Sequence, residues 1–215
     1  MTWLADNWHT VLTLAWRSLY LAGIPLVIGF VLSIPLGWVA NRWSLAYPAI
    51  ITTTGLLYTI PSLALFVIMP ALLGTKILDP VNVVAAMTIY TVALLVRTVA
   101  DGLGAVPDDI AQAATAMGYK GVRRLFGVEL PLAAPVIAAG LRVAAVSNVS
   151  IVSVATLIGV SQLGDLLVDG YNRVIWGELL TGIIACILLA LAFDAVIVLG
   201  TRLVTPWLRV QGARP

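Results

Sequence analysis

Long runs without a single charged residue dominate this chain and limit what it can fold into. No Asp, Glu, Lys or Arg occurs in residues 18–41 or in residues 43–75. A run of about 20 apolar residues is long enough to cross the hydrocarbon core of a bilayer as one helix. Over the whole chain 10% of residues are charged and 61% are hydrophobic, whereas soluble domains carry about 25% charged residues. The chain is therefore predicted to be an integral membrane protein.

Polar and charged breaks divide the 215 residues into about five helical spans, which form a single all-α transmembrane domain over residues 1–215. The expected spans are 18–41, 50–73, 81–100, 132–160 and 179–203. A polar loop at 101–131 separates the third span from the fourth.

An odd number of spans places the two termini on opposite sides of the membrane. Nine of the twelve basic residues then share the side of the polar loop, which the positive-inside rule makes cytoplasmic. We therefore expect a multi-pass protein of the cell membrane with its N-terminus outside and its C-terminus in the cytoplasm. The nine residues are Arg42, Arg97, Lys120, Arg123, Arg124, Arg142, Arg202, Arg209 and Arg214.

Few residues of this chain could carry enzyme chemistry. Cys186 is the only cysteine and His9 the only histidine, so neither a thiolate metal site nor a protease centre has its parts. The chain contains no G-x-x-x-x-G-K-[ST] run for nucleotide phosphates and no basic stripe with interleaved aromatic residues for nucleic acid. We expect no catalytic residue, no metal site and no cofactor in this chain. An ion-coupled secondary transporter remains an alternative.

The polar loop at 101–131 keeps a helical pattern. Pro107, Asp108 and Asp109 are typical of a helix start, because proline is tolerated in the first turn and carboxylates favour the positive end of the helix dipole. Apolar residues recur at helical spacing up to Gly118, where a C-terminal cap is expected. These apolar residues are Ile110, Ala113, Ala114 and Met117.

A second short helix is predicted over 120–128, and Pro131 is expected to end the unit just before the fourth span. Its pattern fits either a helix that lies on anionic lipid or a docking element for a cytoplasmic partner. The apolar face would hold Val122, Leu125 and Phe126, and the basic face would hold Lys120, Arg123 and Arg124.

The spacing within this loop resembles the signature E-A-A-x3-G-x9-I-x-L-P of binding-protein-dependent ABC importer permeases. Here it reads Gln112-Ala113-Ala114, three residues, Gly118, nine residues, Val128, one residue and Leu130-Pro131, with Gln for Glu and Val for Ile. The resemblance implies an ABC type I importer permease fold in which the loop is the coupling helix that docks into an ATPase subunit. The implied coupling residues are Gln112, Ala113, Ala114, Met117, Gly118, Arg123, Arg124, Leu125, Phe126, Leu130 and Pro131.

The same resemblance implies the partners. Two permease subunits, alike or sister chains, would enclose a path through the lipid. Two copies of an ATPase subunit would hold ATP and Mg²⁺, and an extracytoplasmic binding protein would deliver the substrate.

Other stretches resemble the osmoprotectant branch of these permeases, namely TIPSLA at 59–64, LVRT at 95–98 and ATLIG at 155–159. Tyr58 departs from that branch, where a Gln is expected, as does the segment 160–162, where a glycine-rich run is usual. The resemblance implies transport of glycine betaine, choline, carnitine or a related quaternary amine, with another small solute such as an amino acid as the alternative. Candidate path residues are Tyr58, Thr59, Pro61, Ser62, Ser147, Asn148 and Ser150.

Two charged residues lie inside expected spans. Arg142 lies roughly 15 Å from Pro131, and Asp194 lies roughly 12 Å from Arg202, at a rise of 1.5 Å per residue. Both distances count from the cytoplasmic end, so the two depths are similar. Intramembrane charges usually face protein or water and find partners. An ion pair is the leading interpretation, while a gate or ion path, or two separately placed charges, remain open.

Overall fold

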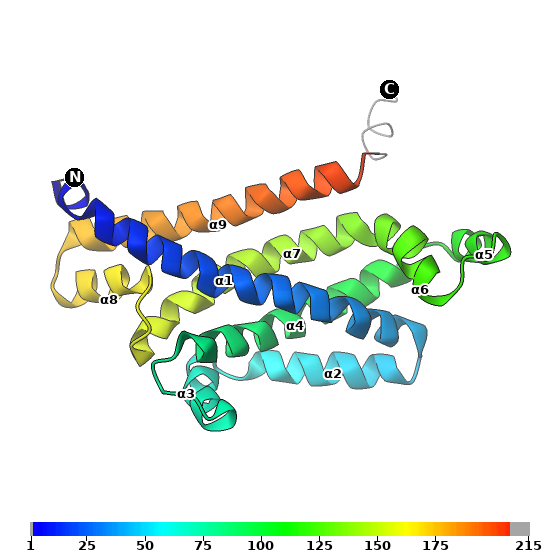
Figure 1. Cartoon of the computed structure of the whole chain (residues 1–215), viewed down its shortest axis with the longest axis horizontal. Helices are drawn as coiled ribbons and strands as arrows, with labels where there is room; N and C mark the ends of the chain where they lie inside the picture. The colour runs from blue at the N-terminus through cyan, green and yellow to red at the C-terminus, as the bar shows by residue number, and fades with distance from the viewer. Residues whose placement is uncertain (1, 207–215) are drawn as a thin grey trace.

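The first span is a single helix that is much longer than expected. The computed structural model describes residues 2–206, in which α1 covers Thr2–Arg42 and contains both Pro25 and Pro35 (Figure 1). Its start near residue 18 was wrong, because the preceding residues are mostly apolar and hold only Asp6 and Arg17 as charges. The helical pattern therefore continues to the N-terminal end of the described chain.

The second expected span is not one straight helix. It is divided into α2, Ala46–Thr59, and α3, Ser62–Leu73, which meet at an angle of 101°. Pro61 explains the break, because a residue before proline is pushed out of the helical region, and Ile60 is extended with φ −65° and ψ 130°. The hydroxyl of Tyr90 donates a hydrogen bond to the Ile60 carbonyl that this break leaves open.

The remaining long helices lie close to the expected spans. In the described part of the chain four helices are long and apolar enough to cross a membrane, and the bent α2–α3 pair makes a fifth if it counts as one span. The protein is thus an all-helical, multi-pass membrane protein. Besides α1, the long helices are α4, Pro80–Gly104, α7, Leu130–Val152, and α9, Trp176–Val204.

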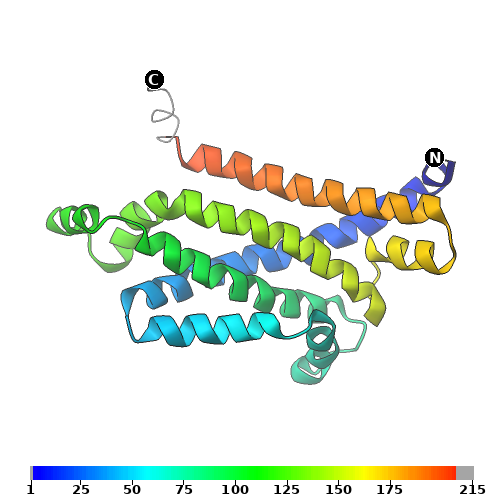
Figure 2. The same ribbon diagram turned by 180° about the vertical axis from the view of Figure 1, so that it is seen from behind.

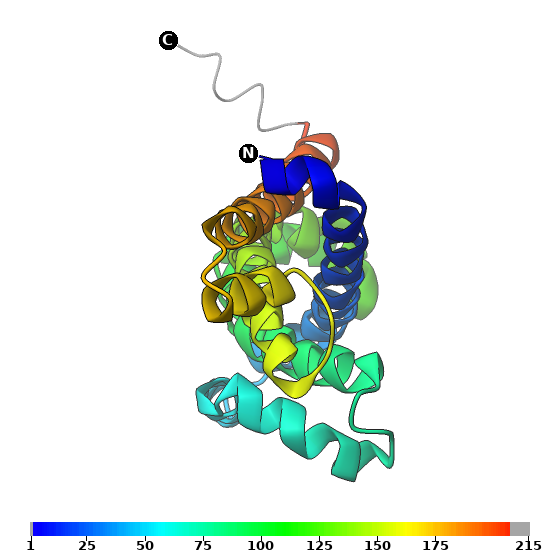
Figure 3. The same cartoon turned by 90° about the vertical axis from the view of Figure 1, so that its left-hand side faces the viewer.

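Two short helices complete one end of the bundle: the first occupies the end of the span expected at 132–160, and the second was not expected from the sequence. A 3₁₀ helix, Ser153–Ile158, extends α7, and α8, Gly164–Asn172, leads back to α9. Figure 3 views the molecule from this end, where α8 lies in front of the long helices and α3 projects from the bundle.

Helix α4 is the centre of the bundle, with α1 and α7 packed against it. Small residues allow this approach: a Cβ atom on Gly29 would lie 2.6 Å from Thr91, and one on Gly140 would lie 2.4 Å from Thr98. Glycines at helix crossings let backbones come together where lipid offers no hydrophobic drive for association.

The two ends of the bundle differ in character. The start of α1, together with α3 and α8, lies at one end, and α5, α6 and the end of α9 lie at the other (Figures 1 and 2). The described ends of the chain are therefore on opposite sides. Arg209 and Arg214, which contribute to the predicted charge bias, lie outside the described residues.

Candidate functional site

The first half of the polar loop is a helix that ends in a glycine cap. Helix α5 covers Asp108–Ala116, and Gly118 follows it with φ +90°. The backbone N–H of Gly118 donates to the Thr115 carbonyl and that of Tyr119 to the Ala114 carbonyl, both at 3.0 Å. This pair of bonds is the Schellman motif, which reverses the chain at a residue in the left-handed region.

One face of α5 points away from the rest of the chain. Gln112 and Ala113 are exposed, and Met117 is 72% exposed. Ala114 is buried instead, so its methyl group seats α5 on its own chain, and its expected coupling role stays a prediction. The surface that α5 presents is small, partly apolar and free of long basic side chains.

Arg124 fixes α5 to the start of α7. Its Nε donates to the Glu129 carboxylate at 2.6 Å and its Nη1 to the Thr115 hydroxyl at 3.1 Å. Glu129 is buried and Arg124 is half-buried. The expected coupling role of Arg124 stays a prediction, and within the chain its guanidinium joins α5 to the π-helical turn before α7. The bonds from Arg124 to Thr115 and Glu129 form a clamp that was not foreseen from the sequence, because Thr115 and Glu129 carry no recognisable signal of their own.

The second half of the loop is continuous with α7. Helix α6, Gly121–Arg124, passes into a π-helical turn, Leu125–Glu129, and then directly into Leu130. The separate helix expected at 120–128 was thus wrong, and Pro131 does not end the unit. Proline is tolerated there because it occupies the first turn of α7.

Leu125 and Phe126 face opposite ways in the π-helical turn. Leu125 is buried against Val99, Leu103 and other side chains of α4 and α7, and its expected coupling role stays a prediction. Phe126 is 57% exposed and lines an apolar cavity of about 440 Å³ together with the half-buried Leu130 and Pro131.

Arg123 is the basic residue that the loop holds outward with a defined orientation. Its guanidinium carbon lies 4.9 Å from the centre of the Tyr119 ring. A cation over an aromatic face is attracted by the ring quadrupole. Tyr119 in turn packs on Gly127, where a Cβ atom would lie 3.2 Å from the ring.

The break between α2 and α3 gathers four of the candidate path residues. Tyr58, Thr59 and Pro61 are exposed, and Ser62 begins α3. The Tyr58 ring meets the Tyr90 ring edge-on, with centroids 5.8 Å apart. The break therefore presents an aromatic ring and hydroxyl groups on an otherwise apolar surface.

The other candidates lie on α7. Ser150 is exposed and Ser147 is half-buried. Asn148 is only 2% exposed, and its amide donates to the Thr91 hydroxyl at 2.9 Å and to the Ala22 carbonyl at 3.3 Å. Its expected place on the path stays a prediction, and within this chain its side chain is held by partners from neighbouring helices, as is usual for a polar group inside a bundle.

Arg142 and Asp194 meet between α7 and α9. Two parallel hydrogen bonds join the guanidinium to the carboxylate, at 2.5 Å from Nε and 3.0 Å from an Nη nitrogen. The side chains keep 47% and 27% of their surface exposed. The contact that similar depth suggested is therefore present in the structure.

A cluster of polar side chains that was not foreseen from the sequence lies at the opposite end of the bundle. The Asp165 carboxylate accepts hydrogen bonds from the hydroxyls of Thr156 and Ser161. Gln162 donates to the Ser153 carbonyl and accepts from the Gly164 N–H. This Asp165 cluster ties the 3₁₀ helix after α7 to α8. The sequence signals in this region were the resemblance at 155–159 and the departure from it at 160–162.

Comparisons with known proteins agree with this architecture. The chain matches, over residues 29–210, the model of a family described as binding-protein-dependent transport system inner membrane component. The osmoprotectant import permease protein OsmW of Salmonella typhimurium is 32% identical over 197 residues, covering 89% of this chain and 90% of the relative. The glycine betaine/carnitine/choline transport system permease protein OpuCB of Bacillus subtilis is 29% identical over 206 residues, covering 96% and 94%.

A solved structure shares the fold. A chain of the MetNI methionine ABC transporter in inward-facing conformations superposes with a TM-score of 0.83 and 19% sequence identity, covering 93% of this chain and 98% of that chain.

Proposed function

This chain belongs to the family of binding-protein-dependent transport system inner membrane components, and we propose that it forms the translocation path of an importer for a small quaternary amine. Glycine betaine, choline and carnitine are the compounds named for its relatives. The alternative is another small solute such as an amino acid.

Importers of this family work with a binding protein, as the family description says. The binding protein delivers substrate at the end of the bundle where α8 lies. Two copies of a separate ATPase subunit bind ATP and Mg²⁺ at the other end, and a second permease subunit completes the path. The N-terminus then lies outside and the C-terminus lies in the cytoplasm, as the basic residues favour.

The attachment of α5 to the start of α7, with one face of α5 left exposed, is the observation that supports this proposal. Its outward face offers Gln112, Ala113 and Met117, which suits insertion of a helix into a groove of the ATPase. Arg124, bonded to Thr115 of α5 and to Glu129, holds α5 against the helix that continues into the membrane. A push on α5 would therefore move α7 rather than only deform the loop. Gln112 replaces the usual Glu, so this docking needs no carboxylate at that position.

The substrate class fits the break between α2 and α3. A quaternary amine is attracted to an aromatic face, and Tyr58 presents its ring there beside the hydroxyl of Thr59. Weak contacts of this kind allow a solute to pass, since a path that binds tightly releases slowly.

Substitution at Gly118 tests the coupling role. Both Asp and Asn tolerate the left-handed backbone that Gly118 adopts, and a Cβ atom there would meet no atom within 4 Å. Gly118→Asp is expected to block co-purification of the ATPase or to abolish ATP-driven uptake, while Gly118→Asn, its uncharged counterpart, retains both in larger part. Normal uptake and normal ATPase co-purification for Gly118→Asp would contradict the docking role.

Substrate and energy source are tested separately in proteoliposomes that contain the assembled transporter and its binding protein. Uptake of labelled glycine betaine, choline and carnitine is compared with that of an amino acid, with and without ATP inside. Uptake driven by an ion gradient without ATP would favour a secondary transporter, and uptake of the amino acid alone would overturn the substrate class.

A further inference from the structure

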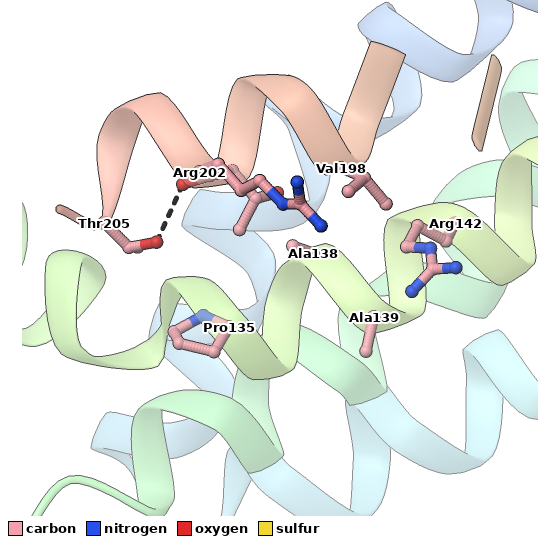
Figure 4. A pocket seen from close by; sticks show the side chains of 8 residues that line it. Pro135, Ala138, Ala139, Arg142, Val198, Arg202 and Thr205 are labelled. Carbon is pink, nitrogen blue, oxygen red and sulfur yellow. Dashed lines mark hydrogen bonds between the residues drawn. The ribbon is translucent and has the colours of Figure 1, made fainter. Parts of the chain in front are cut away.

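Arg97 of α4 and Arg142 of α7 both lie within spanning helices, but their guanidinium groups are used differently. Arg142 lines a groove of about 340 Å³ between α7 and α9 (Figure 4). Asp194 occupies its Nε and one of its Nη nitrogens. The Nε of Arg97 lies 3.6 Å from an Asp101 carboxylate oxygen, which is too far for a good hydrogen bond. The side chain of Arg97 is 69% exposed, so its donors remain open to a ligand from outside the chain.

Arg97 lies on the seam where α2 packs against α4 (Figures 1 and 2). At the polar-loop end of this α2–α4 seam, the Tyr47 hydroxyl donates to the Asp101 carboxylate at 2.8 Å. At the other end the Tyr58 ring meets the Tyr90 ring. The two α2 tyrosines are three helical turns apart, or roughly 16 Å, so they share one face of α2. One seam therefore joins the charged pair to the aromatic break.

Charge makes lipid a poor environment for this seam. Arg97 lies seven residues, or roughly 10 Å, before the last residue of α4. A charged side chain within a span usually faces protein or a water-filled space rather than lipid. The exposed Arg97 and the 50% exposed Asp101 thus mark the seam as the wall of an aqueous space. Because the candidate path residue Tyr58 lies on the same seam, this space is the translocation path of the proposed function.

The Arg97–Asp101 pair has no net charge, but it holds a cation and an anion side by side. Glycine betaine and carnitine do the same, since each has a quaternary amine and a carboxylate. A carboxylate matches the planar fork of an arginine, and the charge of Asp101 attracts the quaternary amine. Choline has the quaternary amine without the carboxylate, so Arg97 repels it and gains no bond in return. The pair is therefore complementary to a zwitterion rather than to a cation.

We propose that Arg97 is a specificity-determining residue of the path, which binds the carboxylate of a transported zwitterion while Asp101, held by Tyr47, faces its quaternary amine. The inference rests on the proposed function and adds to it a preference for zwitterions over choline within the permease itself. Because water screens exposed charges, the contact is weak enough for the solute to move on.

The selectivity of uptake tests this proposal. Proteoliposomes contain the assembled transporter with ATP inside, and its binding protein is saturated with labelled glycine betaine or labelled choline in separate samples. The ratio of the two uptake rates then reports on the path. Arg97→Gln is expected to lower the betaine-to-choline ratio about fivefold, as for a water-exposed charge pair, and Arg97→Lys, which keeps the charge, should lower it less.

Asp101→Asn provides the reciprocal test. It leaves the Arg97 charge to repel a quaternary amine, so choline uptake should fall more than betaine uptake and the ratio should rise. A purely structural role of the pair would move the ratio in the same direction in both variants, or not at all. If Arg97→Gln transports neither solute, Asp101→Asn decides: a raised ratio supports the proposal, and an unchanged or lowered ratio overturns it.

Arg17→Gln is the matched control, because Arg17 is an exposed arginine of α1 that lies 25 residues, or roughly 37 Å, before the end of that helix. It should leave the ratio unchanged, and a shift as large as that of Arg97→Gln would overturn the proposal. An unchanged ratio in Arg97→Gln would overturn the inference alone, since Arg97 would then contact lipid headgroups instead. Uptake of neither solute by the unaltered transporter would overturn the proposed function and this inference with it.

Discussion

Arg142 and Asp194 join α7 to α9 through a bidentate ion pair, although 52 residues separate them in sequence. The Nε–Oδ1 distance is 2.5 Å and the Nη2–Oδ2 distance is 3.0 Å. Two parallel bonds fix both the spacing and the rotation of the two side chains. The pair is the polar link between two helices whose other mutual contacts are largely apolar.

Asp194→Asn should weaken the protein, because it leaves the Arg142 charge inside a span without a carboxylate. The midpoint of thermal unfolding in detergent is expected to fall. The double variant Arg142→Gln with Asp194→Asn removes both charges and should recover part of the loss. A double variant that is less stable than Asp194→Asn alone would show that the pair is not the cause.

Glu129→Gln should release the clamp between α5 and α7. It removes a charge-assisted bond to Arg124, at an expected cost of about 1–3 kcal/mol in the free energy of unfolding. Denaturant titration measures the loss. Asp101→Asn is the control, because its ion pair with Arg97 is exposed on both sides and is worth within about 1 kcal/mol. Equal losses for the two variants would argue against a special role of Glu129.

Gly140→Ala should disturb the crossing of α4 and α7. The added methyl group would lie 2.4 Å from the Thr98 Cγ2 atom, and such overpacking costs about 1–3 kcal/mol. Gly200→Ala in α9 adds the same methyl group where no atom lies within 4 Å, and it should gain up to about 1 kcal/mol from lower backbone entropy of the unfolded chain. The midpoints of thermal unfolding of the two variants are compared in the same detergent. A fall for Gly140→Ala and a rise for Gly200→Ala would show that close packing at Thr98 outweighs the gain in chain entropy.

Tyr90→Phe should destabilise the break between α2 and α3. It removes the hydroxyl that donates to the part-buried Ile60 carbonyl, and the loss of such a hydrogen bond costs about 0.5–1.5 kcal/mol. Hydrogen exchange at the start of α3 should accelerate. Tyr171→Phe serves as the comparison, because the Tyr171 side chain is 76% exposed and its hydroxyl can bond to water. Unchanged exchange in Tyr90→Phe would mean that another group holds the break.

The sequence predicted the elements that depend on local pattern. Apolar runs with few charges placed α4 and α9 within a few residues, and the Gly118 cap was expected from its position after an apolar helical repeat. Similar depth along two spans also predicted the partner of Arg142. These features depend on residue type and spacing, which a sequence displays directly.

The features that the sequence did not reveal depend on which helix faces which. Leu125 and Asn148 have the composition of surface or path residues, yet each is held by a distant part of its own chain, and Arg124 is held by nearby residues of its own loop. The break at Pro61 was hidden because proline is tolerated within some spans, as in α1, and the Tyr90 hydroxyl that bonds to the carbonyl left open at the break comes from another helix.

The helical run from Gly121 to Ile158 is continuous and long enough to transmit a tilt from one side of the membrane to the other. Its 38 residues correspond to roughly 57 Å at 1.5 Å per residue. A tilt of about 5° at the polar loop would displace the far end by roughly 5 Å over that length. That far end carries Thr156, bonded to Asp165. A force applied to the polar loop on one side of the bilayer would therefore displace the Asp165 cluster on the other side.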